Sequence, residues 1–296
     1  RRKTEKRILA LMENTCGRQD CKIEHGLSLY IETAGHKLLA DTGASPAFME
    51  NAKTLGVDLD AVDTVIISHG HYDHAGGLME FCRAYPRAKV WMQRLAGEDY
   101  YHGERYIGID KHLMKLPQVR LLDGDFTIDE ELSLFTGITG RRCFPEGNRA
   151  LRHRRAAAHM PCSVCTDEPD SFADEPDSCV DEPDSFAHEQ CLVIREGERR
   201  VLISGCAHNG ILNILDRYRE QYHGEPDVVI SGFHMMKKTE YAEAERQVIS
   251  DTARELAGYR SVFYTGHCTG EAAIALMRPV MGEKLKVLHC GMEMFL

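Results

Sequence analysis

The sequence predicts an α/β (α+β) protein, and it suits two β-sheets packed face to face with helices on the outside. Short apolar segments of strand length alternate with segments of helical periodicity along most of the 296 residues. Several apolar segments end at a loop that carries histidine, which places these loops at one end of the fold. The composition, with 43% hydrophobic and 28% charged residues, is ordinary for a globular protein. We expect one domain over residues 1–296.

The N-terminal part of the chain is predicted to alternate strands and helices. Strands are expected at residues 7–12, 26–33, 37–40, 64–68 and 90–92. The segment 46–55 is predicted as a helix, because proline lies in its first turn and glycine follows its end. A second helix is expected from about residue 75 to 84, with its apolar residues on one side.

The C-terminal part shows the same alternation. Strands are expected at 191–195, 201–204, 228–230 and 261–264, with an edge strand at 286–289. Helices are expected at 211–220, 238–257 and 270–277. The connecting segment 97–155 is rich in glycine, tyrosine and arginine. It fits either a substrate-binding loop that uses His102, Arg105 and Tyr106 or a solvated connector.

The loop from Ser68 to Gly77 predicts a metal site. Three imidazoles and a carboxylate, those of His69, His71, Asp73 and His74, lie within six residues directly after an apolar strand. Imidazole nitrogen and carboxylate oxygen are ligands for zinc, iron and manganese. On a tight loop the first two histidines can bind one ion, while Asp73 and His74 can point toward a second. The glycines of the loop let the backbone bend closely around such a site.

Three further histidines follow predicted strands in the C-terminal part. His208 comes after the strand ending at 204, His234 after the strand ending at 230, and His267 after the last core strand. Together with the metal loop, four apolar strands each end in a histidine loop. We therefore expect these side chains to converge on one site.

These motifs resemble the metallo-β-lactamase superfamily. The resemblance narrows to the subgroup named for the dihydropterin-ribofuranosylaminobenzene 5'-phosphate synthases. The segments that carry it are Glu24–Ser28, Asp41–Gly43, Ser68–Leu78, Ser204–Gly210, Gly232–His234 and Gly266–Gly270. They cover nearly the whole chain.

The resemblance implies a four-layer αββα sandwich with the metal ions at one edge, between the sheets. It implies a first ion held by His69, His71 and His208 and a second held by Asp73, His74 and His267. The ions are expected to be two Zn²⁺, with iron or manganese as alternatives. Asp73 and His234 are the expected catalytic residues. A role for His234 as general acid or phosphate ligand competes with a structural role at the end of a strand.

Five further residues are assigned supporting or open roles. Asp41 is expected to orient a ligand histidine, although a turn-forming aspartate is the alternative. Cys206 stands where many members carry a bridging aspartate, so a mononuclear or asymmetric site remains open beside the dinuclear one. His188 and Glu189 are alternative ligands in case His208 points elsewhere. His25 is equally balanced between site and surface.

Two functions use such ligands. The first is a metal-dependent hydrolase, in which a metal-activated hydroxide attacks a small phosphorylated or ester-like metabolite. The second, implied by the subgroup name, is a transferase that joins an aminobenzoate to a ribosyl phosphate and binds the departing pyrophosphate with its metals. A di-iron oxygen reductase would require a flavin-binding partner domain, and β-lactam hydrolysis is not expected.

An acidic insertion is predicted at residues 162–187. The sequence Asp-Glu-Pro-Asp-Ser occurs three times with a period of seven, at 167–171, 174–178 and 181–185. Its prolines exclude a coiled coil, and its few apolar residues cannot offset the entropy of ordering. We expect a mobile insertion that can lie against the arginines of 141–155, with the last copy as the part that belongs to the family.

Composition also bounds the partners and the location. The net charge of −10 argues against broad binding of nucleic acid. No run approaches the ~18 apolar residues needed to span a bilayer. The eleven cysteines are an odd number without a framework pattern, which fits reduced thiols in a cytoplasm. The expected partner is a small-molecule substrate, and the oligomeric state is open.

Overall fold

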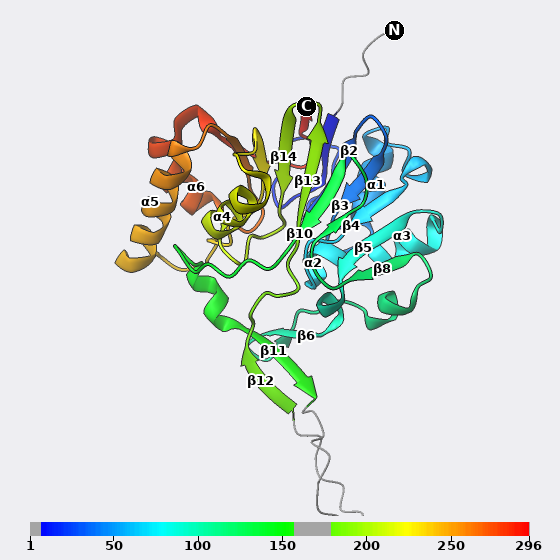
Figure 1. Cartoon of the computed structure of the whole chain (residues 1–296), viewed down its shortest axis with the longest axis horizontal. Coiled ribbons are helices and arrows are strands. Elements are labelled where there is room, and N and C mark those ends of the chain that lie inside the picture. Colours follow the sequence, from blue (N-terminus) through cyan, green and yellow to red (C-terminus); the bar gives the residue numbers. More distant parts are fainter. Residues whose placement is uncertain (1–6, 157–178, 296) are drawn as a thin grey trace, which may run out of the picture.

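The computed structural model describes residues 7–156 and 179–295, and two large sheets dominate its fold (Figure 1). The first is a seven-stranded sheet with the order β18-β1-β2-β3-β4-β5-β8. Its strands are β1 (Arg7–Met12), β2 (Ser28–Glu32), β3 (Lys37–Ala40), β4 (Thr64–Ile66), β5 (Lys89–Gln93), β8 (Val119–Leu122) and β18 (Glu293–Phe295).

The second sheet also has seven strands, in the order β17-β16-β15-β14-β13-β10-β9. Its strands are β9 (Phe126–Thr127), β10 (Leu132–Phe135), β13 (Cys191–Glu196), β14 (Arg199–Ile203), β15 (Val228–Ile230), β16 (Val262–Thr265) and β17 (Leu285–Val287). Strands β3, β4, β5 and β8 run parallel in the first sheet, and β14 to β17 run parallel in the second.

The helices cover the outer faces of the two sheets (Figure 1). The first sheet carries α1 (Ala47–Thr54) and α3 (Leu78–Ala84), whereas the short α2 (Tyr72–Ala75) lies within the metal loop after β4. The second carries α4 (Ile211–Tyr222), α5 (Glu243–Gly258) and α6 (Glu271–Met281). Short 3₁₀ helices lie at Leu59–Ala61, Arg94–Gly97, Lys111–Lys115, Glu146–Ala150 and Gly282–Lys284. The predicted α/β class and the αββα order of layers are confirmed.

Alternation along the strands explains this layering. In β1, Ile8 and Ala10 pack between the two sheets, while Leu9 and Leu11 pack against α1 and α3. Strand side chains alternate between the two faces of a sheet, so one strand supplies both cores. Both faces are buried, and the parallel strands are therefore short, nearly continuous apolar runs such as Val228–Ile230.

The segment 97–155 is more structured than a solvated connector. It contributes β8, β9 and β10 to the two large sheets, and also part of a third, four-stranded sheet. That small sheet has the order β12-β11-β6-β7, formed by β6 (Asp99–His102), β7 (Arg105–Tyr106), β11 (Leu151–Ala156) and β12 (Cys179–Pro183). Sequence reasoning missed it because its strands are short and rich in polar residues, and because β11 pairs with β6 and β12 from distant parts of the chain.

The acidic insertion divides into two parts. Its first two repeat copies lie outside the described residues. The third copy lies within them, and its residues 181–183 belong to β12, which pairs antiparallel with β11. Asp181 forms ion pairs with Arg152 and Arg154. The expected contact with the arginines of 141–155 is therefore present in this copy, whereas the expected mobility of the insertion stays a prediction.

Two predicted helix boundaries also differ. The helix expected at about 75–84 is two helices, α2 and α3, interrupted at Gly76 and Gly77. These glycines press against the backbone that follows β3: a Cβ on Gly76 would lie 2.1 Å from the carbonyl oxygen of Ala44. The helix expected from 238 begins at Glu243, where the Glu245 carboxylate accepts a hydrogen bond from the Ala242 N–H at 2.7 Å.

We expect Gly76→Ala to destabilise the protein by roughly 1–3 kcal/mol, because the added Cβ would collide with backbone that cannot rotate away. The free energy of unfolding from denaturant titration measures this loss. Gly224→Ala is the matched control, since a Cβ there meets no atom within 4 Å. Its effect is expected to stay within about 0.5 kcal/mol. Equal losses in the two variants would contradict the close approach at Gly76.

Candidate metal centre

The candidate ligands lie where strands of both sheets end. The metal loop follows β4, and the loops that carry His208, His234 and His267 follow the parallel strands β14, β15 and β16. Parallel neighbours end at the same edge of a sheet, so these loops meet there. Backbone hydrogen bonds connect the metal loop to the neighbouring segments of the chain. The Thr42 N–H, for example, donates to the carbonyl of His74 at 2.7 Å.

A first group brings together His69, Cys206 and His208, with one ligand atom of each within 4.8 Å of the others. The Nε2 atoms of both histidines are buried and have no hydrogen-bond partner among the described residues. The His71 ring lies beside them, with its centroid 4.6 Å from that of His69 and 4.8 Å from that of His208. Buried polar atoms without partners are costly. These atoms fit a cation.

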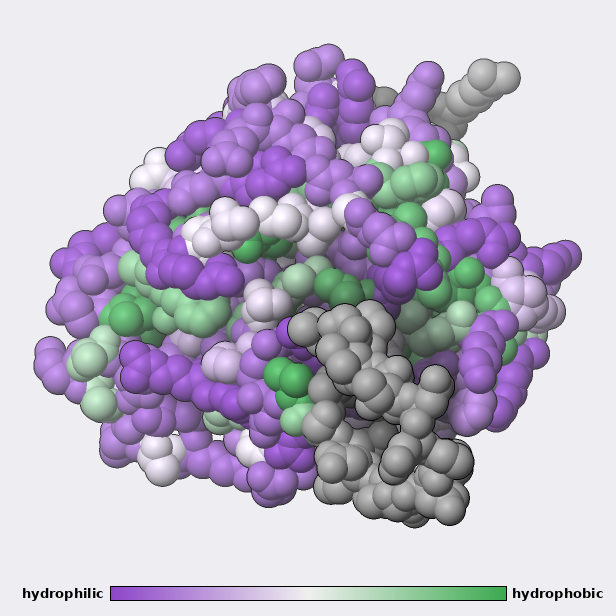
Figure 2. All heavy atoms as spheres, turned by 60° about the horizontal axis from the view of Figure 1, so that its bottom comes forward, coloured by the Kyte–Doolittle hydropathy of each residue, from purple (hydrophilic) through white to green (hydrophobic). Residues whose placement is uncertain are grey.

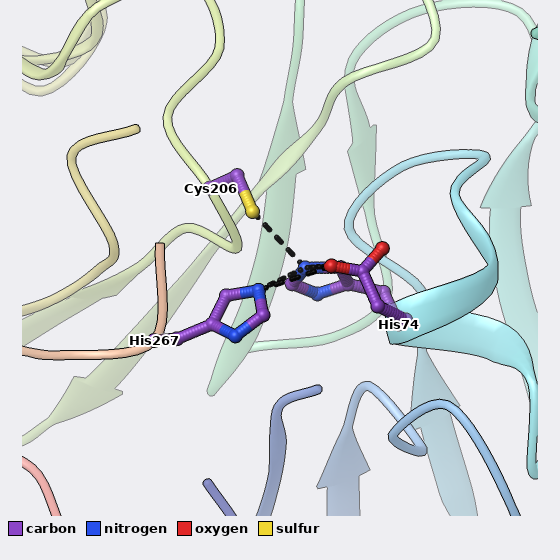
Figure 3. A group of neighbouring side chains, drawn as sticks. His74, Cys206 and His267 are labelled. Atoms are coloured by element: carbon purple, nitrogen blue, oxygen red, sulfur yellow. Dashed lines mark hydrogen bonds and ion pairs between the residues drawn. The ribbon is translucent and has the colours of Figure 1, made fainter. Parts of the chain in front are cut away.

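A second group brings together Asp73, His74, His267 and the same Cys206 (Figure 3). The Nε2 atom of His74 lies 3.1 Å from Nε2 of His267 and 3.1 Å from Sγ of Cys206. The Asp73 carboxylate lies 3.2 Å from Nε2 of His267. Two imidazole nitrogens at this distance can share one proton at most. A carboxylate, two imidazoles and a sulfur around one point are a typical donor set for a divalent metal ion.

Cys206 occupies the position between the two groups. It is the residue that both groups share, which is where a bridging ligand stands in a dinuclear site. It also forms a third group with His234 and Cys268. Burial raises the pKa of the Cys206 thiol well above its ordinary value, so a thiolate here needs a cation beside it.

Hydrogen bonds fix which nitrogen of each histidine faces the site. Nδ1 of His208 lies 3.0 Å from Oδ1 of Asn148, and Nδ1 of His267 lies 2.8 Å from Oδ1 of Asn14. Since these oxygens only accept, each Nδ1 carries the proton and each Nε2 keeps a lone pair toward the site. The two asparagines have no signal in the sequence, because Asn14 follows β1 and Asn148 lies in the 3₁₀ helix Glu146–Ala150, both far along the chain from the histidines that they contact.

Asp41 likewise binds the Nδ1 side of one histidine in each group, so that Nε2 of that histidine faces the site. It accepts hydrogen bonds from Nδ1 of His74 at 2.6 Å and from the hydroxyl of Ser68 at 2.7 Å. The Ser68 oxygen in turn lies 2.8 Å from Nδ1 of His69. One buried carboxylate thus orients His74 directly and His69 through a hydroxyl. This geometry fits the orienting role expected for Asp41 better than that of a simple turn residue.

Burial keeps three of the candidate ligand histidines neutral, and neighbouring groups keep Asp73 ionised. Burial lowers the pKa of His69 and His208 well below the ordinary value and that of His71 to about 3, so these imidazoles are neutral. Neutral imidazole is the form that binds metals. Burial acts to raise the pKa of Asp73, but the neighbouring His74 and the nearby His25 and His267 lower it well below the ordinary value. Asp73 is therefore a carboxylate.

The backbone is strained where it presents these side chains. Seven described residues other than glycine have positive φ, and Asp41, Ala207, His234 and His267 are four of them, with φ between 46° and 61°. Such conformations cost about 1–3 kcal/mol each when the surroundings enforce them. Their concentration around one site indicates that ligand geometry is maintained at the expense of stability.

His25 and His234 stand at the open side of the site. Nε2 of His25 lies 3.4 Å from Asp73, and its side chain is 43% exposed. The His234 ring centroid lies 4.2 Å from that of His208, and its Nδ1 is buried without a partner among the described residues. Both line a cavity of about 300 Å³ above the ligands. They are placed to meet a substrate.

His188 and Glu189 lie behind the ligands. The Glu189 carboxylate accepts hydrogen bonds from the backbone N–H groups of His208 and Asn209, at 2.7 and 2.9 Å, and thereby fixes the loop after β14. Both nitrogens of His188 have hydrogen-bond partners, Gly70 and Asp184. Because His208 does lie beside His69, neither residue is needed in its place.

The cavity is lined by more residues than the histidine motifs predicted. His102 and Arg105 of the small sheet line it, as does Lys238 from the segment before α5, whereas Tyr106 does not. Hydrophilic residues dominate the face shown in Figure 2. No helix among residues 7–156 and 179–295 has the length and apolar character to cross a membrane.

We expect Asp41→Asn to weaken metal binding by about 10- to 100-fold, because it removes the charge that orients His74 and Ser68. Competition for zinc against a chromophoric chelator measures the affinity. Asp123→Asn is the control, since Asp123 is an exposed partner of Arg94. Equal zinc affinities in both variants would remove Asp41 from the support of the site.

Comparison with known proteins agrees with this geometry. A profile described as the Metallo-beta-lactamase superfamily matches residues 23–256. An uncharacterized protein of Methanocaldococcus jannaschii, MJ0448, is 26% identical over 234 residues, covering 77% of this chain and 79% of that protein. The 7,8-dihydropterin-6-methyl-4-(beta-D-ribofuranosyl)-aminobenzene-5'-phosphate synthase of the same organism is 24% identical over 291 residues, covering 90% and 88%.

A solved structure extends the similarity to the fold. Tm1679, a metal-dependent hydrolase of the beta-lactamase superfamily, is 29% identical, with a TM-score of 0.77 over 98% of both chains. The resemblance seen in the sequence motifs, including that to the synthase subgroup, is confirmed by these matches. The profile match, the fold and the grouped ligands lead to one conclusion: the chain belongs to the metallo-β-lactamase superfamily and is an enzyme with its metallohydrolase fold.

Proposed function

We propose that the protein is a hydrolase that uses two divalent metal ions to cleave a small phosphorylated or ester-like metabolite. The observation that carries the proposal is the pair of ligand groups that share Cys206. His69, His71 and His208 would hold the first ion, and Asp73, His74 and His267 the second. Such a pair lowers the pKa of a bound water and stabilises the attacking and leaving oxygens.

The donor set favours zinc. It combines imidazole nitrogen, one carboxylate and a sulfur in a buried site. Thiolate is a soft ligand that suits zinc or iron, whereas manganese prefers oxygen donors. The sulfur of Cys206 therefore supports two Zn²⁺ first, iron as the alternative, and manganese least. A site with one filled position remains the competing arrangement, because a thiolate is not equivalent to a bridging carboxylate.

Cationic side chains at the mouth of the cavity support a phosphorylated substrate. Arg105 and Lys238 line the cavity and are exposed, and within the described part of the chain neither forms an ion pair. The Arg105 guanidinium lies 5.0 Å from the ring of Tyr72, which holds it over the site. Unpaired cations near a metal pair are suited to bind phosphate oxygens.

The position of His234 between two cavities supports a binding site for an apolar group of the substrate. It lines the cavity above the ligands and also a neighbouring cavity of about 210 Å³, which is otherwise lined by residues such as Met235, Tyr241 and Ile249. A cavity of about 150 Å³ accommodates benzene. A group leaving the metal ions toward this side would meet His234, in keeping with its proposed role as general acid or phosphate ligand.

The transferase remains the second candidate, because a synthase is among the relatives that span most of the chain. It would use the same ligands to bind pyrophosphate. The cysteine content also supports a reducing compartment, and we propose the cytoplasm. A small molecule remains the proposed substrate, and the acidic net charge supports no role in nucleic-acid binding.

We expect the purified protein to bind two zinc ions and His74→Ala to bind one, because His74 belongs to the second group alone. Metal analysis with anomalous scattering from crystals measures both occupancy and position. His112→Ala is the control, since its side chain is 83% exposed. Full turnover by the His74 variant would contradict the two-metal mechanism.

Arg105→Ala is expected to raise KM for an aryl phosphodiester by about tenfold or more, because a charged hydrogen bond contributes about 1.5–3 kcal/mol. KM for an uncharged aryl ester should stay unchanged, as should both values in Arg87→Ala, whose arginine is an exposed partner of Asp60. Steady-state kinetics on both substrates measures this difference.

The same assays separate the two candidate functions. Release of pyrophosphate from an aminobenzoate and a phosphoribosyl donor, without turnover of the ester and phosphodiester panel, would replace the hydrolase by the transferase. Turnover of the panel without pyrophosphate release supports the hydrolase.

A further inference from the structure

The third copy of the acidic repeat lies between the arginines of β11 and the metal centre. Its first residues, Asp181 and Glu182, pair with Arg152 and Arg155 at 2.8 and 3.2 Å on the small sheet. Its fourth residue, Asp184, lies on the inner side of the chain and is only 8% exposed. The backbone N–H of Asp184 donates to the carbonyl of Leu151 at 3.1 Å, which fixes its position.

The Asp184 carboxylate forms two hydrogen bonds. One oxygen accepts from the Phe186 N–H at 2.7 Å, and the other lies 3.1 Å from Nε2 of His188. Nδ1 of His188 accepts from the Gly70 N–H at 2.9 Å, so the proton of His188 lies on Nε2 and is donated to Asp184. A chain of two hydrogen bonds thus connects Asp184 with the backbone between His69 and His71.

His71 faces the same carboxylate. Its Nε2 is buried, has no hydrogen-bond partner among the described residues and lies 3.9 Å from the Asp184 oxygen that accepts from His188. This distance is too long for a direct hydrogen bond, but a bridging water or a small rotation of the ring spans it. In the other candidate ligand histidines, Nδ1 has a hydrogen-bond partner. In His71, by contrast, it is Nε2 that faces a carboxylate, that of Asp184.

The group of His71, Asp184 and His188 is not an additional metal site. Three such side chains could hold an ion by their proximity. Both nitrogens of His188 are already used by Gly70 and Asp184, however, and Phe186 occupies the second carboxylate oxygen. The group therefore acts as support.

We propose that Asp184 is a positioning residue for the metal centre. It holds the Nε2–H of His71, which leaves Nδ1 of that ring for the first ion, and through His188 it fixes the backbone at Gly70. The inference rests on the proposed two-metal function, because it assigns His71 to the first ion. The third copy of the repeat is then part of the catalytic framework.

The repeat itself offers matched controls for a test. Asp184→Asn keeps the size of the side chain and the bond from Phe186, but removes the charge. Asp181→Asn changes an acid of the same copy that pairs with arginines on the small sheet. Asp177→Asn makes the identical change at the corresponding position of the second copy. All three variants are made in the whole 296-residue chain and loaded with zinc or cobalt.

We expect Asp184→Asn to lower the affinity for one of the two ions by about 10- to 100-fold while the other ion is retained. Chelator competition measures the affinities, and the visible absorption of the Co²⁺ form reports the ligand geometry at the weakened site. Asp181→Asn and Asp177→Asn should match the wild type in both, and Asp184→Glu should recover part of the affinity. If Asp184→Asn also matches the wild type, the proposal is wrong.

A second variant keeps the test independent of folding. His188→Gln breaks the connection between Asp184 and Gly70 while Asp184 stays in place, and it should weaken the same ion with the same change in the cobalt spectrum. Weakening of the other ion, or none, would overturn the proposal even if Asp184→Asn fails to fold. Metal binding is measured without substrate, so a wild type that binds two ions but hydrolyses nothing would refute the proposed function alone.

Discussion

One buried carboxylate, that of Asp41, connects the fold with the chemistry of the site. Asp41 directly follows the parallel strand β3, and its oxygens accept hydrogen bonds from the Ser68 backbone and hydroxyl and from His74. Through them it aligns the start of the metal loop and one histidine of each ligand group. A buried charge is stable in this position because both carboxylate oxygens have hydrogen-bond donors. The arrangement of both ligand groups therefore depends on where β3 places this side chain.

The metal centre is maintained against local strain. Asp41, Ala207, His234 and His267 adopt left-handed backbone conformations, and the loop glycines approach neighbouring backbone more closely than any Cβ would allow. These costs are compensated by the two sheets, whose inward and outward faces are both filled with apolar side chains. The parallel strands themselves are regular. The strain is confined to the turns at their carboxyl ends, where function requires side chains to converge.

Local sequence patterns predicted the strands, the helices and the histidine loops, because the signals for them are short in range, whereas the layered sandwich was implied by the resemblance to the superfamily. Strand alternation, the proline and glycine around α1 and the density of histidine in the metal loop are all visible within about ten residues. Asn14, Asn148 and Asp184 were missed, because nothing near them in sequence indicates a partner. Their importance arises from distances across the fold, such as the 3.0 Å between Asn148 and His208. The small sheet was missed for the same reason, since β11 pairs with β6 and β12 through charged residues.

The acidic repeat shows why local sequence was insufficient to predict the structure of its third copy. Three copies of the same five residues carry the same propensity, and from composition alone all three are predicted to be mobile. The third copy is distinguished by the residues that come after it, Phe186, His188 and Glu189, which are buried beside the metal loop. These residues bring Asp184 under His71, while Asp181 and Glu182 face the arginines of β11. An identical sequence therefore acquires different surroundings from its neighbours: burial removes Asp184 from water and places its carboxylate 3.9 Å from Nε2 of His71.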